Sequence, residues 1–272
     1  MNPLLRRNCL IVMLFVLGWT LPFGVSWSDE PSATELPARE RFHLFLLVGQ
    51  SNMAGRGKVA DPDKQTHPRV LKLSKDGDWV PAIDPLHFDK PNIVGVGIGR
   101  SFAAEIAAAN PEITIGLIPC AVGGSPIASW EPGGYHAATK THPWDDALTR
   151  AKLALKSGTL KGILWHQGES DSKPELAKDY EEHLHALIAR FRLALDAESA
   201  PFIAGQMGQF PKRPWDDSRK LVDAAHRNLP KHVSHTAFVS SDGLTHKGDL
   251  VHFDTKSYRE LGCRYAKAYL DR

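Results

Sequence analysis

The sequence is poor in cysteine, with three in 272 residues. Cys9 lies at the start of an N-terminal apolar run, which leaves Cys120 and Cys263 in the remainder of the chain. Two cysteines are too few for the disulfide framework on which small secreted domains depend. Both lie in segments with the pattern of a strand or a helix. We therefore expect two free thiols and a fold held together by its apolar core.

The sequence also lacks an excess of charge of one sign. Lys and Arg number 33, Asp and Glu number 31, and the only charged residues among the first 28 are Arg6 and Arg7. The chain beyond residue 28 therefore carries 31 residues of each sign and is formally neutral with histidine uncharged. A neutral chain without a basic stretch argues against nucleic acid or an anionic membrane surface as a partner.

The longest apolar run is confined to the N-terminus. Arg6 and Arg7 precede CLIVMLFVLGWTLPFGVSW, and Ser26 and Ser28 follow at the small-residue spacing of a signal-peptide cleavage site. We expect residues 1–28 to be a signal peptide, 29–40 a linker and 41–272 the mature domain. The protein would then be exported, periplasmic or secreted, with no stable membrane partner. The alternative is an uncleaved anchor, because the run approaches the length of a membrane span.

Beyond residue 40, apolar strand-like runs alternate with helical segments. The expected strands are 41–48, 113–120, 160–166, 200–207 and 234–241, and the expected helices are 97–110, 142–157, 173–195, 216–229 and 254–272. Strands and helices that alternate in this way predict parallel strands joined by right-handed crossovers. We therefore expect an α/β fold, a three-layer α/β/α sandwich around a parallel sheet. Segment 58–96 breaks the alternation and is expected to hold a small β-hairpin.

Ligands of such sheets bind beyond the carboxyl ends of the strands. The residues that follow the expected strands are small, polar or titratable, and include Gly49, Gln50, Ser51, Asn52, Gly124, Gln167, Glu169, Asp249 and His252. The segment LLVGQSNMAGRG, residues 46–57, fits neither the Walker pattern nor the dinucleotide fingerprint, which argues against a phosphate-binding loop. GxSxG is absent as well, which excludes the usual α/β-hydrolase elbow.

Ser51, at the end of a strand, is the candidate nucleophile. His252 is the candidate base, and Asp249, three positions earlier, is the candidate acid that orients it. Glu169 is an alternative or additional acid. The backbone amides of Ser51 and Gly124 and the side-chain amide of Gln167 are candidate donors to an oxyanion hole.

Four motifs in this order, GQSNMAGRG, GGSPIASW, HQGESD and DLVHFD, resemble those of the sialate O-acetylesterase-like group of the SGNH hydrolase superfamily. That group includes the acetyl xylan esterases of carbohydrate esterase family 6. The resemblance spans about residues 43–270 and implies a flavodoxin-like sandwich, a Ser–His–Asp triad without metal, and removal of acetyl groups from sugars. The family's nucleophile, base and acid fall on Ser51, His252 and Asp249. Its oxyanion donors fall on Ser51, Gly124 and Gln167.

Most candidates have a purely structural alternative. Ser51 suits a helix N-cap, and most of the thirteen histidines must be ordinary surface or core residues. His166 and His252 lack a third ligand at metal-like spacing, so no metal and no other cofactor is expected. Trp130, in the polar segment ASWEPGGYH, is either a core residue or a platform for stacking on a sugar, and we favour the platform.

The sequence thus predicts an exported serine esterase that removes O-acetyl groups from a polysaccharide or oligosaccharide of the acetyl xylan or sialate type. Two alternatives stay open. One is a lipase or thioesterase on the same scaffold, acting on other acyl esters. The other is a non-catalytic carbohydrate-binding module of the same fold. The motifs distinguish neither among acetylated sugars nor among oligomeric states.

Overall fold

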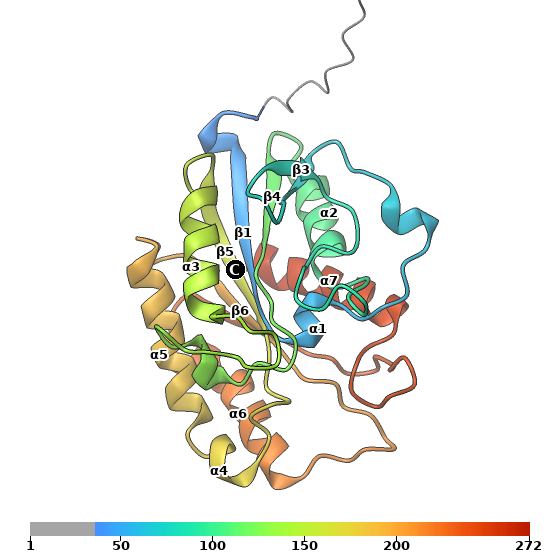
Figure 1. Cartoon of the computed structure of the whole chain (residues 1–272), viewed down its shortest axis with the longest axis vertical. Helices are drawn as coiled ribbons and strands as arrows, with labels where there is room; N and C mark the ends of the chain where they lie inside the picture. The colour runs from blue at the N-terminus through green and yellow to red at the C-terminus, as the bar shows by residue number, and fades with distance from the viewer. Residues whose placement is uncertain (1–35) are drawn as a thin grey trace, which may run out of the picture. The chain divides into compact units, whose positions relative to one another are not determined.

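A seven-stranded sheet lies at the centre of the computed structural model, which describes residues 36–272 (Figure 1). The expected signal peptide and the first part of the expected linker lie outside the described residues. The strands are β1 Phe42–Gly49, β2 Val70–Leu73, β3 Trp79–Pro81, β4 Thr114–Pro119, β5 Thr159–His166, β6 Phe202–Gly205 and β7 Thr236–Val239. Their order is β3-β2-β4-β1-β5-β6-β7, and every pair is parallel except β2 with β3.

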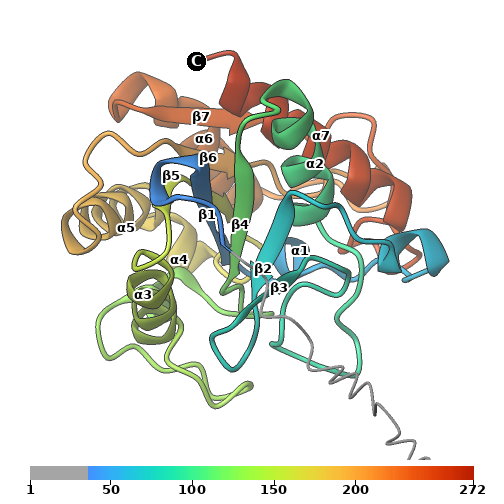
Figure 2. The ribbon, with the colours of Figure 1, turned by 90° about the horizontal axis from the view of Figure 1, so that it is seen from above.

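Helices cover both faces of the sheet. They are α1 Ser51–Ala54, α2 Gly99–Ala109, α3 Pro143–Ala154, α4 Pro174–Ala177, α5 Tyr180–Ala194, α6 Asp217–His232 and α7 Thr255–Leu270. Figure 2 shows α2 and α7 on one side of the sheet and α3 and α5 on the other. The predicted three-layer α/β/α sandwich is confirmed. Among the described residues, no helix is both long enough and apolar enough to cross a membrane.

The central strand β1 explains the two apolar layers. Leu44 and Leu46 pack in the layer that contains residues of α3, α5 and α6, whereas Phe45 and Leu47 pack in the layer of α2 and α7. All four are fully buried. A strand covered on both faces is expected to be continuously apolar, as the run from Phe42 to Val48 is, apart from His43.

At β1 the direction in which successive strands are added to the sheet reverses: β2, β3 and β4 lie on one side of β1, and β5, β6 and β7 lie on the other. β4 pairs with one edge of β1 and β5 with the other, and α3 carries the chain from β4 to β5 across the sheet. The segments that leave neighbouring strands on opposite sides separate at such a point and open a crevice. Ser51 follows β1 here, Gly124 follows β4 and Glu169 follows β5.

Two elements differ in detail from the sequence-based expectation. The expected hairpin is present as β2 and β3, but β2 also pairs in parallel with β4, so the hairpin extends the central sheet. The expected helix 173–195 is two helices, α4 and α5, separated at Asp179, whose φ of −104° and ψ of 1° are not helical. Glu181 and Glu182 lie in the first turn of α5, where negative charge favours a new helix start through the helix dipole.

Candidate active site

A glycine at the end of β1 produces the turn that presents Ser51. Gly49 has a φ of 126°, and a Cβ atom there would lie 2.3 Å from the carbonyl oxygen of His166 on β5. Only glycine accepts both this conformation and this approach. The N–H of Gln50 donates to the same His166 carbonyl at 2.9 Å. The chain then turns into α1 with Ser51 as its first residue, at the carboxyl edge of the sheet.

Ser51, His252 and Asp249 form a continuous hydrogen-bonded chain. The Oγ of Ser51 lies 2.9 Å from Nε2 of His252, and Nδ1 of His252 lies 2.7 Å from Oδ2 of Asp249. Ser51, the first residue of α1, and His252, in the loop before α7, lie 201 positions apart in the sequence. Ser51 as a whole is 7% exposed and therefore largely buried. The distances are those required between a nucleophile, its base and an orienting acid.

The loop between β7 and α7 brings the carboxylate of Asp249 back to the imidazole. Oδ1 of Asp249 accepts hydrogen bonds from the N–H of Val251 at 3.0 Å and of His252 at 2.8 Å. Leu250, between them, takes a left-handed φ of 58°, which is uncommon for a residue with a side chain. An Asp followed by such a turn places its second oxygen against the ring three residues later.

The charge state of Asp249 follows from the same contacts. Partial burial alone would raise the pKa of its carboxyl, but the hydrogen bonds from the His252 backbone and ring and from Val251 outweigh it and lower the pKa to about 2. An ionised carboxylate only accepts hydrogen bonds, so Nδ1 of His252 carries the proton. Nε2 is then free to accept the proton of the Ser51 hydroxyl.

Two backbone amides near Ser51 are available to a ligand. Within residues 36–272, neither the N–H of Ser51 nor that of Gly124 has a hydrogen-bond acceptor. Gly124 is exposed and has a φ of 86°, in the left-handed region that glycine tolerates. Free amides at the end of two adjacent strands suit an oxygen that gains negative charge.

A buried ion pair holds the loop that carries Gly124. Nη2 of Arg56 lies 2.6 Å from Oδ2 of Asp89, and the two side chains are 2% and 0% exposed. The same carboxylate oxygen accepts the N–H of Gly123 at 2.8 Å. Asp89 was not a sequence-based candidate, because it lies in segment 58–96, far from any expected strand end. It links the turn that follows Ser51 to the loop that carries Gly124.

Gln167 does not offer its side-chain amide to Ser51, and this sequence-based expectation is wrong. Nε2 of Gln167 donates to the carbonyl of Ser125 at 3.1 Å and to the carboxylate of Asp171. Its Oε1 accepts from the hydroxyl of Tyr180 at 2.7 Å. The side chain is fully buried, and turning the amide over would place its oxygen against two acceptors. Gln167 therefore braces the loops after β4 and β5.

Glu169 contacts the turn that carries Ser51 and not the imidazole of His252. Its Oε1 accepts from Nδ2 of Asn52 at 2.6 Å, and Nδ1 of His252 is occupied by Asp249. Asn52 is fully buried, and its Oδ1 accepts from the hydroxyl of Tyr258 at 2.7 Å. The Asn52 amide also donates to the carbonyl of Val251, beside His252. Asn52 thus fixes the positions of the serine turn and the histidine loop relative to each other.

Trp130 is a core residue, so the expectation that it stacks on a sugar is wrong. Its side chain is 0% exposed, packs edge-on against Trp165 and donates from Nε1 to Oγ of Ser125 at 3.0 Å. Tyr135, in the same segment of the sequence, is the aromatic side chain that is exposed, at 54%.

Two further polar residues, which the sequence did not single out, lie beside Gly124. A Cβ atom on Gly124 would be 4.0 Å from Nζ of Lys90 and 3.9 Å from Nε2 of His136. Partial burial and then the charge of Lys90 lower the pKa of His136. Both side chains would therefore border a ligand bound at the Gly124 amide.

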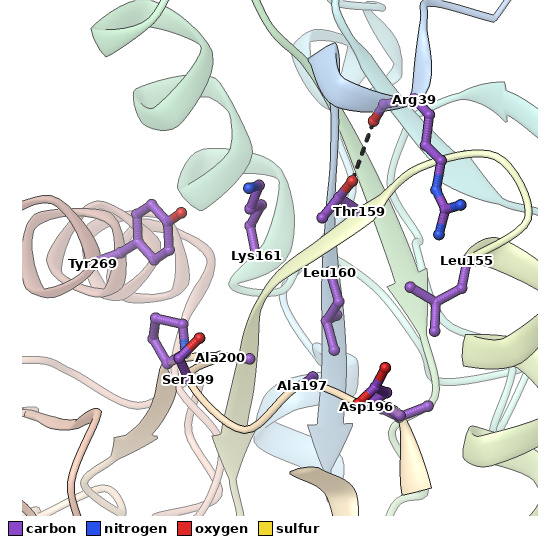
Figure 3. Close-up of a pocket in the computed structure, with 12 residues that line it drawn as sticks. Arg39, Leu155, Thr159, Leu160, Lys161, Asp196, Ala197, Ser199, Ala200 and Tyr269 are labelled. Atoms are coloured by element: carbon purple, nitrogen blue, oxygen red, sulfur yellow. Dashed lines mark hydrogen bonds between the residues drawn. The ribbon is translucent and has the colours of Figure 1, made fainter. Parts of the chain in front are cut away.

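A hollow of about 530 Å³ lies elsewhere, around the first residues of β5 (Figure 3). Thr159, Leu160 and Lys161 line it, with Arg39 at the start of the described domain and Tyr269 on α7. In Figure 3 the hydroxyl of Thr159 points to the carbonyl of Arg39, which accepts its hydrogen bond at 3.4 Å. Ser51 lies beyond the carboxyl ends of the strands, whereas this hollow lies at their amino ends. It contains no nucleophile paired with a base.

Comparisons with known proteins identify relatives of this chain in sequence and in fold. Residues 41–271 match a family model described as carbohydrate esterase, sialic acid-specific acetylesterase. A probable carbohydrate esterase from Arabidopsis thaliana is 32% identical over 247 residues, which cover 84% of this chain and 90% of that protein.

Solved structures show the same fold. A protein from Arabidopsis thaliana superposes with a TM-score of 0.76 at 31% identity, over 87% of this chain and 99% of that one. NanS superposes with a TM-score of 0.70 at 18% identity, over 87% and 98% of the two chains. A carbohydrate acetylesterase from Xanthomonas citri gives a TM-score of 0.61 at 20% identity, over 83% of this chain and 55% of that one.

Proposed function

The chain belongs to the carbohydrate esterase family described as sialic acid-specific acetylesterases and is a carboxylic ester hydrolase. We propose that it removes O-acetyl groups from carbohydrates through an acetyl-Ser51 intermediate. The observation that carries the proposal is the chain of contacts from Ser51 through His252 to Asp249, at 2.9 and 2.7 Å. It lies beside two amides without an acceptor among the described residues, those of Ser51 and Gly124.

In the first half of the reaction, Nε2 of His252 takes the proton from Ser51 as its Oγ attacks the acetyl carbonyl carbon. The carboxylate of Asp249 holds the imidazole in the required tautomer and stabilises the imidazolium that forms. The carbonyl oxygen becomes an oxyanion and accepts hydrogen bonds from the amides of Ser51 and Gly124. Collapse of this intermediate breaks the bond to the sugar oxygen, which takes the proton from His252 and leaves as an alcohol.

In the second half, water replaces the sugar. His252 takes a proton from the water as the water oxygen attacks the acetyl carbon of acetyl-Ser51. The same two amides hold the second oxyanion. Its collapse returns the proton to Oγ of Ser51 and releases acetate. All proton transfers pass through one nitrogen, Nε2 of His252, whose 2.9 Å distance from Ser51 suits this role.

The proposal is tested by acetate release from acetylated carbohydrates, with Ser51→Ala as the matched variant. We expect wild-type activity and a loss of at least about a thousandfold in the variant, as for removal of other serine nucleophiles. Unfolding of both proteins by urea checks that the variant is folded. Acetate release from Ser51→Ala at the wild-type rate would overturn the mechanism.

The acyl specificity and the sugar are tested with two substrate series. Aryl esters from acetate to octanoate distinguish an acetylesterase, which prefers the shortest ester, from a lipase. Acetylated xylan, O-acetylated sialic acid and other acetylated oligosaccharides then define the sugar. We propose acetylated carbohydrate as the substrate class because the family and the Arabidopsis relative carry that description. A preference for octanoate would contradict it.

We further propose that the protein is exported and cleaved after Ser28. The charged start, the apolar run and the small residues Ser26 and Ser28 support this. Expression of the full chain followed by N-terminal sequencing of the extracytoplasmic protein should give Asp29 as the first residue. An intact N-terminus in the membrane fraction would support an uncleaved anchor instead.

A further inference from the structure

Three potential metal ligands from two helices meet at the surface of the protein. Glu181 and His185 lie on α5, and His232 is the last residue of α6. Each of the three side chains offers one ligand atom, and these three atoms all lie within 4.8 Å of one another. Nδ1 of His232 is 2.8 Å from Oε1 of Glu181, and Nε2 of His185 is 3.9 Å from the same oxygen. We call these three side chains the α5–α6 cluster.

The helices position the cluster without distortion. Glu181 and His185 are four residues apart, so they lie on the same face of α5, one turn after the other. α6 packs against α5, and the hydroxyl of Tyr180, next to Glu181, lies 2.9 Å from Nε2 of His226 on α6. Two ligands therefore come from one rigid helix and the third from its neighbour. The spacing of these residues in the sequence, 181, 185 and 232, does not reveal this, because the third ligand depends on helix packing.

One atom of the cluster has an unmet bonding requirement. Nε2 of His185 is inaccessible to solvent and has no hydrogen-bond partner among the described residues. A buried polar nitrogen without a partner is unfavourable, because it has lost its water without replacing it. That nitrogen is also the one within 3.9 Å of the Glu181 carboxylate oxygen. A cation between them would bind both.

We propose that the α5–α6 cluster binds a zinc ion. Two imidazoles and one carboxylate, with water as the fourth ligand, are a ligand set that zinc accepts. Bonds of about 2.0–2.1 Å in a tetrahedron separate the ligand atoms by roughly 3.3 Å. The two distances of 2.8 and 3.9 Å lie on either side of this value, so small side-chain rotations would complete the geometry.

The ion would join the start of α5 to the end of α6. Tyr180 immediately precedes Glu181, and its hydroxyl donates to Gln167 in the loop after β5. None of the three ligands contacts Ser51, His252 or Asp249. The bound zinc therefore stabilises the fold on this side of the sheet and takes no part in ester hydrolysis. Because the free energy of metal binding adds to that of folding, thermal stability reports on the site independently of activity.

The experiment uses untagged, chelator-treated protein titrated with zinc chloride by calorimetry and followed by thermal unfolding. His185→Gln and His232→Gln each remove one ligand. His183→Gln is the matched control, because His183 lies on the same helix but outside the cluster. We expect one zinc per chain in the wild type and the control. At free zinc a hundredfold above the dissociation constant, the melting temperature should rise by roughly 5–10 °C.

Both ligand variants should bind zinc at least tenfold more weakly and lose most of the thermal shift. In the presence of chelator, all four proteins should melt within about 3 °C of one another, which shows that the variants are folded. Zinc binding that is equally strong in all four proteins would overturn the proposal and direct attention to Cys120 or Cys263. Absence of any thermal shift in the wild type would overturn it as well.

Discussion

Asp249 determines which nitrogen of His252 carries the proton. Its pKa, lowered to about 2 by the hydrogen bonds from His252 and Val251, keeps the carboxylate ionised at every pH at which an esterase works. An imidazole that donates from Nδ1 can only accept at Nε2, where Ser51 lies. The catalytic competence proposed for Ser51 therefore depends on a residue that never touches the substrate.

Asp249→Asn and Glu169→Gln should separate the two acids. An amide at position 249 can stabilise the wrong tautomer of His252, so kcat/KM for an aryl acetate should fall by about 10³–10⁴. Glu169→Gln keeps an oxygen acceptor for Asn52 and should reduce kcat/KM by less than about tenfold. Steady-state kinetics at pH 7.5 measures both. A larger loss of kcat/KM in Glu169→Gln than in Asp249→Asn would contradict the assignment of Asp249 as the orienting acid.

For individual residues, the sequence predicts the position in the fold but not the direction in which the side chain points. The sequence predicts that Ser51, Asp249 and His252 lie close together, because the carboxyl ends of parallel strands meet at one edge and an Asp-x-x-His segment can form a short turn. Gln167 and Trp130 occupy equally suggestive positions, yet their side chains point into the protein. The direction in which a loop side chain points depends on its buried partners, Asp171 for Gln167 and Trp165 for Trp130, and the sequence does not show which residues pair.

At the scale of elements, the loop after β4 depends on the ion pair between Arg56 and Asp89. The pair is buried, and Asp89 accepts a hydrogen bond from the N–H of Gly123. This contact holds the neighbouring Gly124 amide in place. Arg56→Met would leave the Asp89 carboxylate buried without its cation, which should lower the free energy of unfolding by about 3–5 kcal/mol. Loosening the loop that carries Gly124 should also reduce kcat, up to the 10²–10³-fold expected for loss of one oxyanion donor.

Urea denaturation and acetate release measure these two effects. The control is Lys267→Met, which removes the partner of Asp271 in a pair whose side chains are 76% and 60% exposed. An exposed pair contributes less than about 1 kcal/mol, so this control should be nearly as stable as the wild type and fully active. An equal loss of stability in the two variants would argue against the special role of the buried pair.

The helices and strands could be predicted from the sequence wherever the local pattern of apolar residues determines them. The continuous apolar run of β1 and the amphipathic helices are visible in the sequence, and so was the β2–β3 hairpin. The break at Asp179 was missed, since segment 173–195 has helical periodicity throughout. The strand order has no local signal, because it depends on which edge of β1 each crossover reaches.

For the whole molecule, three buried histidines should control stability in acid. Burial lowers the pKa of His87, His166 and His226 to about 3. In the unfolded chain each has a pKa near 6.5, so their stabilising contribution is complete above that value and is lost as the pH falls toward 3. Asp84 has the opposite effect on the pH dependence of stability, because burial raises its pKa to about 7 and the folded protein therefore binds its proton more tightly than the unfolded chain.

Between pH 4 and 5.5 the unfolded chain should therefore bind a net two protons more than the folded protein at these four sites. The free energy of unfolding should fall by about 2.7 kcal/mol for each pH unit of acidification. Asp84→Asn removes the opposing group and should steepen the slope to about 4 kcal/mol per unit. Urea denaturation at half-unit pH intervals measures both slopes. A stability independent of pH in this range would contradict neutral buried histidines.

The central claim is that Ser51 carries the acetyl group during turnover, and the most direct test is to trap that intermediate. Asp249→Asn slows the steps that His252 assists, so acetylated protein should accumulate during reaction with an activated aryl acetate. Acid quenching followed by peptide mass spectrometry should then find one acetyl group on the peptide that contains Ser51, and none in the Ser51→Ala/Asp249→Asn protein. Acetylation at another residue, or turnover with Ser51 never modified, would contradict the account.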